Sequence, residues 1–383
     1  MIEIAIVGGG IGGLTAAIAL RQYGFQPHVF EEAPALLDIG AAIALWPNAI
    51  RALQHVGVAE QVLSAAGVIN EIRWLNRDGI SLNSIRIANP SAPAVALHRA
   101  DLQRLLLQAL PSSTITLGHS FLKHHRNTDS VKVTFNNSKS IDCRVLTGAD
   151  GIHSVVRAEI IGDSSPQFRG YIVWRGIAPA VPEGLPPDIA IELHGRGERF
   201  GIGPVGRGRI GWWAAANSSV ENVVTKEVPT DAHDELLELF HGWYAPVRKL
   251  IESTSVILRT EATDRPATTT WGRGRTTLLG DSIHPTTPNL GQGGCMAIED
   301  AMVLARCFEK YGATELALRA YERVRYSRTA NITMLSRLYG DIGQWESSTA
   351  TWLRSKTFSM LPTAVIRRLL RIVFDYDAAS VRI

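Results

Sequence analysis

The chain has 383 residues, of which 45% are hydrophobic and 20% are charged, and its formal net charge is +3. This length predicts one large domain or two interlocked domains, since domains usually contain roughly 100–200 residues. The small net charge gives no electrostatic support for a nucleic-acid partner.

The cysteines and the N-terminal sequence indicate the cellular compartment of the protein. Cys143, Cys295 and Cys307 have no CxxC spacing, which argues against a disulfide framework or a zinc site. The apolar start, MIEIAIVGGG, is too short and too rich in glycine for a signal peptide or a membrane span. We therefore expect a soluble cytoplasmic protein without a metal.

Strand and helix patterns alternate at the start of the chain. IEIAIVG predicts a buried strand, GLTAAIALRQYG a helix that ends at Gly24, and QPHVFEE a second strand, which together form a βαβ unit. The stretch from LNRDG to RIANPS predicts a hairpin. HRADLQRLLLQAL then predicts a helix, and TITLGHSFLKHH, VKVTFNN and DCRVLTGAD predict strands.

The pattern changes after residue 165. From Tyr171 to about Ala262, short alternating segments with Gly/Pro turns predict an antiparallel sheet, interrupted by one helix in DAHDELLELFHGW. TTLLGD then returns to a buried strand, and helices are expected from Gly293 to the end. An α/β part is therefore split in sequence by an antiparallel insertion.

A glycine cluster joins the first strand to the first helix. VGGGIGGL places Gly8, Gly10 and Gly13 in the GxGxxG spacing of a dinucleotide turn, in which the helix N-terminus receives the pyrophosphate. Glu31, at the end of the second strand, suits a ribose hydroxyl pair and argues against a resident NADPH. The alternative is a helix start that merely packs tightly. The fingerprint does not distinguish NAD from FAD.

A second turn of this kind follows the later buried strand. In GDSIHPTTPNLGQGGCMAIEDA, Asp281 stands at the carboxyl end of that strand, and Gly291 to Gly294 open a helix. A second helix N-terminus aimed at one ligand favours a group that gains negative charge, as reduced flavin does at its N1–C2 edge. Asp281 could accept from the ribityl hydroxyls. The pair of turns therefore favours FAD.

With these two turns and the middle motif GADGIHSVVR (148–157), the chain resembles the single-component FAD-dependent aromatic monooxygenases, the hydroxylases of salicylate, para-hydroxybenzoate, urate and alkylquinolones. GAAIALWPNA and HRADLQRLL extend the likeness over nearly the whole chain. The resemblance implies an α/β fold: a Rossmann-like FAD-binding domain of the glutathione-reductase type, an inserted antiparallel-sheet substrate domain, and C-terminal helices. We expect the FAD-binding domain in 1–70, 96–165 and 266–330, the substrate domain in 71–95 and 166–265, and the helical region in 331–383.

The resemblance also implies the cofactor site. Gly12 and Gly13 would lie along the pyrophosphate, Glu31 would hold the adenosine ribose, and Arg99 would reach the phosphate or ribityl region. The backbone of Phe121 would lie by the adenine. The complete predicted set is Gly8, Gly10, Ile11, Gly12, Gly13, Glu31, Glu32, Arg99, Phe121, Asp150, Asp281, Gly291, Gln292, Gly293 and Gly294.

Other polar residues of these motifs have ordinary interpretations. His284 is expected to bond within its own loop, and Arg157 is either a salt-bridge anchor or a nicotinamide contact. Glu299 and Asp300 are expected on a solvated or capping face of their helix.

By the same resemblance, NADH or NADPH would act as a transient reductant, and a C4a-hydroperoxyflavin formed with O2 would hydroxylate an aromatic or N-heterocyclic small molecule. The catalytic candidates are Arg199, Trp213 and Pro288. Arg199 stands where urate-hydroxylating relatives carry an active-site arginine; the alternative is an exposed strand residue. Trp174 is a further candidate in the antiparallel sheet, which is expected to cover the flavin. Trp212 and Trp213 should face opposite ways, so that at most one lines the pocket. One cation in an apolar pocket suits a planar substrate that can be deprotonated.

Several alternatives stay open. The same motifs also resemble epoxidases of isoprenoid alkenes, and a non-catalytic flavin-binding sensor could use the same scaffold. Near the C-terminus, AVIRRLLRIVF has apolar residues at helical spacing with Arg367, Arg368 and Arg371 between them. It could touch a membrane surface, although a helix docked on its own protein is favoured. The oligomeric state is expected to be a monomer or a homodimer.

Overall fold

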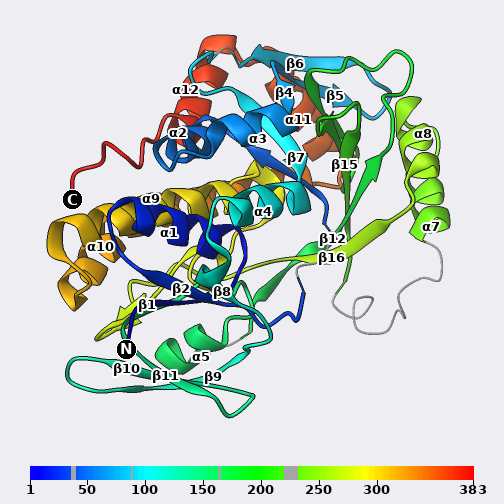
Figure 1. The fold of residues 1–383 in the computed structure, drawn as a ribbon. Helices are drawn as coiled ribbons and strands as arrows, with labels where there is room; N and C mark the ends of the chain where they lie inside the picture. Colours follow the sequence, from blue (N-terminus) through cyan, green and yellow to red (C-terminus); the bar gives the residue numbers. More distant parts are fainter. Residues whose placement is uncertain (36–39, 88, 163–164, 220–231) are drawn as a thin grey trace.

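The computed structural model describes residues 1–35, 40–87, 89–162, 165–219 and 232–383. Parts of the ranges expected as 1–70, 71–95, 96–165 and 166–265 therefore lie outside the described residues. Two large sheets and a small one are joined by helices, and the N-terminal strand and the long helices α9 and α10 occupy the same half of the molecule (Figure 1).

The first sheet has eight strands in the order β17-β18-β11-β1-β2-β8, with β10 and β9 added antiparallel beside β11. Its strands are β1 (Ile2–Val7), β2 (Pro27–Phe30), β8 (Ile115–Thr116), β9 (Phe121–Arg126), β10 (Val131–Phe135), β11 (Ser140–Gly148), β17 (Gly272–Arg273) and β18 (Thr276–Leu278). One expected strand, TITLGHSFLKHH, is divided between β8 and β9, with 117–120 between them.

The parallel register of this sheet aligns the three sequence motifs. Val7 of β1 is paired with Gly148 of β11, and Gly148 is paired with Leu278 of β18. Each of these residues ends or nearly ends its strand, and each is followed by one of the motifs. The carboxyl ends of parallel strands are where open α/β sheets bind ligands. Residues separated by more than 250 positions therefore meet at one edge.

Helices cover this sheet. Helix α1 (Ile11–Gln22) packs against α9 (Gly293–Tyr311), which in turn contacts α10 (Glu315–Gly343). All residues of α1 from 13 to 20 are buried, because it lies between the sheet and other helices. The other helices here are α2 (Pro47–His55), α3 (Ala59–Ala65), α4 (Arg99–Gln108) and α5 (Val155–Ile161).

The second sheet has seven strands in the order β16-β12-β15-β14-β13-β5-β6. They are β5 (Glu71–Asn76), β6 (Ser81–Arg86), β12 (Gln167–Ala178), β13 (Ile189–His194), β14 (Glu198–Pro204), β15 (Ile210–Asn217) and β16 (Ile257–Asp264). The hairpin expected around LNRDG is β5 and β6. The purely antiparallel expectation is wrong at one place, because β13 pairs with β5 in parallel. These two strands come from separate segments, so no tight hairpin constrains their direction.

A small sheet of β3 (Ala42–Leu45), β7 (Ala94–His98) and β4 (Gly67–Ile69) lies between the larger ones. Helices α7 (Ala232–Leu239) and α8 (Pro246–Ser253) pack on the second sheet, and α11 (Ser348–Met360) and α12 (Thr363–Phe374) reach β6 near the C-terminus. The short 3-10 turns are η1 (Ser112–Thr114), η2 (Gly280–Ser282) and η3 (Pro288–Leu290).

Candidate active site

The first glycine turn is shaped both by packing and by an open side. Gly8 has a φ of +109°, and a Cβ on Gly13 would collide with the Gly8 carbonyl oxygen. A Cβ on Gly10, by contrast, would meet nothing within 4 Å among the described residues. Gly10 is the N-cap of α1 and supplies no side-chain cap. The turn therefore offers free space at a helix N-terminus, which fits a phosphate group.

Glu31 lies at this turn and Glu32 does not. The Glu31 carboxylate accepts hydrogen bonds from the backbone N–H of Gly9 at 2.5 Å and of Ala33 at 2.9 Å. Glu32 is exposed, and its nearest polar partner is Ser120 Oγ at 3.4 Å. Only Glu31 is therefore placed to meet a ribose beside the glycines.

Phe121 and Asp150 flank the same turn. Phe121 is buried at the start of β9, two residues after His119, whose N–H bonds to the Glu31 carbonyl oxygen. The Asp150 carboxylate accepts from Ser154 Oγ at 2.5 Å and from the Val156 N–H at 3.1 Å. Burial raises the pKa of Asp150, while these hydrogen bonds oppose the shift. The Asp150 side chain therefore stabilises the start of α5, and its backbone borders the turn.

The second glycine turn places Asp281 at the start of α9. A Cβ on Gly293 would lie 3.6 Å from Asp281 Oδ1. The Asp281 side chain borders the cavity and is exposed there. Burial raises its pKa, whereas the charges of His284 and Arg99 act in the opposite direction. An acceptor and a helix N-terminus thus lie side by side.

The two turns share one edge of the molecule. A Cβ on Gly12 would lie 2.7 Å from Leu279 Cδ2 and 3.2 Å from Ala297 Cβ. Leu279 precedes the second turn and Ala297 belongs to α9, so α1 and α9 are in close contact at their N-terminal ends. This arrangement fits a single extended ligand whose opposite ends meet the two turns.

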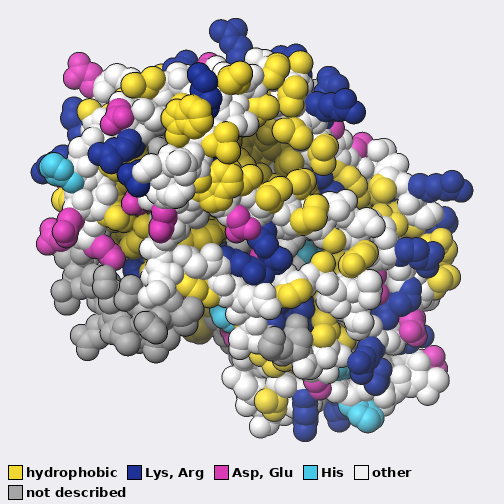
Figure 2. Space-filling view, turned by 180° about the vertical axis from the view of Figure 1, so that it is seen from behind, with side chains coloured by type: hydrophobic (Ala, Val, Ile, Leu, Met, Phe, Trp, Pro, Cys, Tyr) yellow, Lys and Arg dark blue, Asp and Glu magenta, His cyan; other side chains and the backbone are white. Residues whose placement is uncertain are grey.

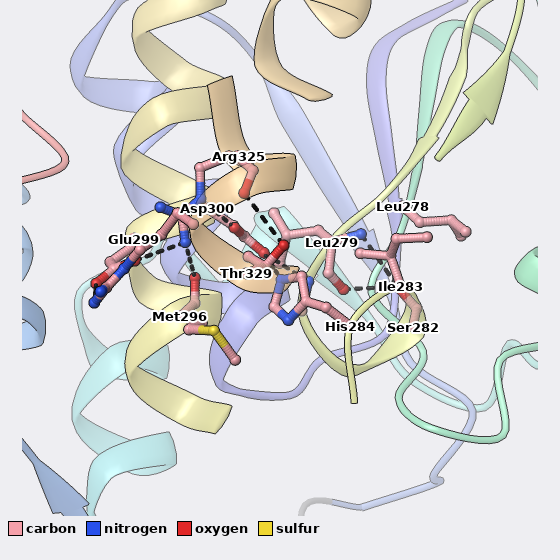
Figure 3. A network of polar contacts seen from close by, with 12 residues as sticks. Leu278, Leu279, Ser282, Ile283, His284, Met296, Glu299, Asp300, Arg325 and Thr329 are labelled. Carbon is pink, nitrogen blue, oxygen red and sulfur yellow. Dashed lines mark hydrogen bonds and ion pairs between the residues drawn. The ribbon is translucent and has the colours of Figure 1, made fainter. Parts of the chain in front are cut away.

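Beneath the second turn lies a buried network of charged groups (Figure 3). Asp300 accepts from the Gly280 N–H at 2.9 Å, from His284 Nε2 at 2.6 Å and from Arg325 Nε at 2.7 Å. Burial alone would raise the pKa of Asp300, but His284 and Arg325 lower it to about 2. The expectation that His284 bonds within its own loop is therefore wrong for its side chain.

Glu299 joins this network from the next position of α9. It pairs with Arg325 at 2.7 Å and with Arg328 at 2.9 Å, and it accepts from Asn48 Nδ2 at 2.6 Å. Glu299 and Asp300 are both 0% exposed. The expectation of a solvated or capping face is wrong, because both carboxylates pair with Arg325 of α10, and Glu299 also accepts from Asn48 of α2.

Gln292 faces this network and not the open side. Its Oε1 accepts from Asn48 Nδ2 at 2.9 Å, and its side chain is fully buried. Arg157 also has a structural role, since its Nη1 donates to the carbonyl oxygens of Ser282 and Ile283 at 3.2 and 2.8 Å. It therefore fastens the middle motif to the last one, which favours the anchor interpretation.

A cavity of about 420 Å³ extends from the second turn to the second sheet. Figure 2 shows a hollow lined by hydrophobic side chains, with Lys and Arg side chains near the surrounding surface. Its aromatic lining comprises Trp46, Trp74, Tyr171, Trp212, Trp213, Tyr339 and Phe374. Its charged lining comprises Arg175, Glu192, Arg199 and Asp281, two of each sign. Pro288 of η3 and Gly291, Gly293 and Gly294 also line it.

Arg199 is fully buried in the wall of this cavity, so the exposed-strand alternative is wrong. Nε donates to Gln344 Oε1 at 2.7 Å, Nη1 to Glu192 Oε1 at 3.2 Å and Nη2 to Asn289 Oδ1 at 2.6 Å. Its guanidinium carbon lies 5.3 Å from the centre of the Trp213 ring. The expected cation is present, but protein groups already neutralise it and occupy all three nitrogens.

The two adjacent tryptophans have their rings on opposite faces of the sheet. A Cβ on Gly201 would collide with the Trp213 ring, so Gly201 lets that ring lie flat across β14 beside Arg199. The Trp212 ring stacks on Phe200 and donates to Thr254 Oγ1 at 2.8 Å. Both residues border the cavity, where we expected one at most. Trp174 lies in the hydrophobic core on the Trp212 side and does not line the cavity.

Several lining residues were not anticipated. Glu192 accepts from Tyr339 OH at 2.6 Å, and Asn289 Nδ2 donates to Tyr171 OH at 2.9 Å. Asn289 belongs to a motif that was recognised, so a polar loop side chain there could have been considered. Tyr339 lies in a long helix and Glu192 in a strand of ordinary alternation, so no local signal marks them.

Two classes of feature are absent from the part of the chain that the structure describes. No helix there is long and apolar enough to cross a membrane. No group of three or more His, Cys, Asp or Glu side chains there is placed to hold a metal ion.

Comparisons with known proteins agree with this geometry. Residues 1–336 match the family described as FAD binding domain. The chain is 40% identical over 366 residues to aurachin C monooxygenase/isomerase of Stigmatella aurantiaca, covering 94% of both chains. It is 36% identical over 343 residues to 3-amino-4-hydroxybenzoate 2-monooxygenase of Streptomyces cremeus, covering 86% of this chain and 85% of the relative. The crystal structure of Klebsiella pneumoniae HpxO with FAD and uric acid superposes with a TM-score of 0.89 at 29% identity, covering 97% of each chain.

The chain therefore belongs to the FAD-binding family whose fold and double glycine turn it shows. Within that family it is one of the single-component FAD-dependent aromatic monooxygenases. The epoxidase and sensor alternatives have less support than monooxygenation of an aromatic or heterocyclic compound.

Proposed function

We propose that this flavoprotein uses NADH or NADPH and O2 to hydroxylate a planar aromatic or N-heterocyclic small molecule that binds in its uncharged form. The observation that carries this proposal is the cavity of about 420 Å³, which begins at Asp281 and Gly293 and ends at Arg199 and Trp213. It is contiguous with the second glycine turn, and its aromatic walls match a planar ring.

The residues present fit FAD. Gly10 leaves room for the pyrophosphate, Glu31 lies where a ribose would meet the turn, and Asp281 and the start of α9 lie at the opposite end. Arg99, the first residue of α4, is a further candidate for the phosphate or ribityl region. Bound FAD would take up electrons from the nicotinamide and activate O2.

The chain's own residues would bind and orient the substrate and exclude water. The N-terminus of α9, at Gly293, provides a positive end of a helix dipole for negative charge that develops nearby. Trp213 and Tyr171 would hold the ring, and the apolar walls would keep water from the reacting atoms. Pro288 would limit the depth of the cavity at η3.

The charge of the cavity supports an uncharged substrate. Arg199 already has Glu192 as its counter-ion, and its other two nitrogens donate to Gln344 and Asn289. A substrate carboxylate at Arg199 would compete with Glu192 for the same cation, and displacement of Glu192 would leave that carboxylate without its counter-ion. Removing one member of a buried charge pair is strongly unfavourable.

We also assign the domains from the strand pairing. The first sheet and its helices constitute the FAD-binding part, and the second sheet constitutes the substrate part. The expected boundary between 330 and 331 would cut the continuous helix α10, and that between 95 and 96 would cut β7. We therefore begin the C-terminal helical region after Gly343 and keep β7 with its partners β3 and β4. The three buried free thiols favour a cytoplasmic location.

The test is anaerobic reduction of the bound flavin by NADH and by NADPH, followed by reaction with labelled O2. A matched pair of compounds is 4-hydroxyquinoline and its 2-carboxylate. We expect the uncharged member to accelerate flavin reduction and to gain one labelled oxygen atom. Preference for the carboxylate would overturn the assignment of an uncharged substrate. Flavin reduction without oxygen transfer to any uncharged aromatic would overturn the proposed reaction.

A further inference from the structure

The C-terminal helix α12 is apolar around more of its circumference than the protein covers. Ile366, Val373 and Phe374 are buried on its inner side. Val365, Leu369 and Ile372 are 42%, 54% and 55% exposed. Their spacing of i, i+4 and i+7 puts them in one stripe along the helix. The expectation of a helix docked on its own protein accounts for the inner side but not for this outer stripe.

Basic side chains border the exposed stripe. Arg367, Arg368 and Arg371 are all exposed and occupy the remaining arc of the helix. Arg371 Nε lies 3.9 Å from Asp375 Oδ2, at the distant end of ion-pair range. A helix with an apolar face and arginines beside it suits the boundary between lipid headgroups and acyl chains. The arginines would then contact anionic headgroups.

The preceding helix also carries exposed apolar side chains. Trp352, Leu353 and Met360 of α11 are 66%, 54% and 70% exposed. The corner between the helices is fixed, because Asn83 Nδ2 donates to the carbonyl oxygens of Phe358 and Leu361 at 2.7 and 3.0 Å. These side chains are therefore held in place on a folded support.

The far end of α12 is held in the same way. Arg328 donates to the carbonyl oxygens of Ile372 and Val373, both at 2.7 Å, and Arg51 donates to that of Phe374. The outer stripe is thus a fixed face of the molecule.

The opposite side of α12 reaches the substrate cavity. Leu370, Val373 and Phe374 line the cavity, and the Phe374 ring stacks on that of Trp46 at 4.7 Å. One helix therefore carries the exposed apolar stripe on its outer face and part of the cavity wall on its inner face. The hollow in Figure 2 is likewise surrounded by hydrophobic side chains at the surface.

We propose that the outer face of α12, with the exposed residues of α11, rests on an anionic lipid bilayer, and that a lipophilic substrate enters the cavity from the lipid alongside α12. The first part concerns lipid binding alone. The second part rests on the proposed function.

Sedimentation with vesicles tests the first part. We expect the flavin-loaded protein to sediment with vesicles of phosphatidylglycerol and phosphatidylcholine more than with phosphatidylcholine alone. The variant R367Q/R368Q/R371Q should bind the anionic vesicles about a hundredfold more weakly, since each arginine near the surface adds a similar increment. L369S/I372S should also lose binding. The control Leu122→Ser, which alters a residue 53% exposed on β9, should bind as the unaltered protein does.

Binding to neither kind of vesicle would overturn the docking proposal. So would binding of R367Q/R368Q/R371Q and L369S/I372S to anionic vesicles that equals that of the unaltered protein. So would a homodimer that L369S/I372S dissociates and vesicles do not, because the face would then join two copies of the chain. For the second part, L369S/I372S should slow oxidation of an alkylated quinolone carried in vesicles and leave that of water-soluble 4-hydroxyquinoline unchanged. Equal rates for the two proteins on the vesicle-borne compound would overturn entry from the lipid. Failure on both compounds would count against the proposed function and leave the vesicle-binding result valid.

Discussion

At the scale of single residues, the glycines of the site have two physical functions. Some permit protein to pack where a Cβ would collide, as at Gly13 and Gly201. Others leave space that the protein itself does not fill, as at Gly10 and Gly203. Substitution by alanine distinguishes these two functions. In the first set the added methyl group should disturb the fold, and in the second set it should disturb only the binding of a ligand.

The substitution Gly10→Ala should therefore weaken FAD binding by about tenfold or more, which corresponds to 1.4 kcal/mol or more. The folded chain should keep its unfolding temperature, since Gly10 already has φ −74°, a conformation that alanine adopts. Titration of the deflavinated protein with FAD and thermal unfolding measure the two quantities. Gly203→Ala is the matched control: it should keep FAD affinity and lower the affinity for substrate. Equal FAD affinity in all three proteins would contradict the assigned function of Gly10.

The pair formed by Arg199 and Glu192 provides a second prediction. Arg199→Met should lower the free energy of unfolding by about 3 kcal/mol, because it leaves a largely buried carboxylate without its counter-ion. Arg199→Met with Glu192→Gln should recover most of that loss. Urea unfolding of the single and double variants measures this coupling. An additive effect of the two changes would show that the charges are not paired.

At the scale of secondary-structure elements, the second glycine turn depends on the contact between α9 and α10. Asp300 holds both the Gly280 N–H and His284 in place, and Arg325 supplies the charge from α10. In the sequence, Asp281 lies between Gly280 and His284. The proposed acceptor for the cofactor, Asp281, is therefore positioned by a carboxylate that does not border the cavity.

This contact should be sensitive to acid. The pKa of Asp300 is lowered from 3.8 to about 2, so the folded state binds fewer protons than the unfolded state in that interval. The contribution of Asp300, about 2 kcal/mol, should be present above pH 4 and be lost as the pH falls from about 4 to 2. Asp300→Asn should unfold more easily at pH 7 and show a flatter pH dependence in this interval, measured by urea unfolding. An unchanged slope would refute the assignment.

Helix α10 also shapes the cavity from outside through two glycines. A Cβ on Gly343 would lie 2.8 Å from Arg199 Nε, and a Cβ on Gly340 would collide with Asn289. Gly343→Ala should therefore displace the guanidinium and raise KM for substrate about tenfold while FAD content stays constant. Alanine is otherwise favourable in a helix by about 1 kcal/mol over glycine, so the loss cannot be attributed to the helix. The exposed position Ser327→Ala serves as the control, and an unchanged KM for Gly343→Ala would be contrary to this account.

At the scale of the whole molecule, the sequence predicts the parts that local pattern determines. The βαβ start, the two glycine turns, Glu31 and Asp281 follow from strand, glycine and acid in order. Burial of Glu299 and Asp300 could not be predicted, since it depends on Arg325 of another helix. The parallel pairing of β5 with β13 also arises from segments more than 100 residues apart. Contacts of this kind leave no local periodicity.

The lining of the substrate cavity also depends on contacts that the local sequence pattern does not predict. Arg199 could be named from resemblance, but its counter-ion Glu192 and its hydrogen-bond acceptors Asn289 and Gln344 come from three separate segments. From the sequence we expected a substrate that can be deprotonated, whereas these partners are the basis of our proposal that the substrate is uncharged. The chemistry of a site is thus determined by residues that only the fold brings together.

The central claim is that one FAD connects the two glycine turns and presents its ring to the cavity. A crystal structure of the FAD complex with 4-hydroxyquinoline tests it most directly. We predict the pyrophosphate at Gly10, the flavin ring beside Gly293, and the quinoline within the cavity between that ring and Trp213. FAD that contacts only one of the two turns, or a quinoline bound outside the cavity, would contradict the account.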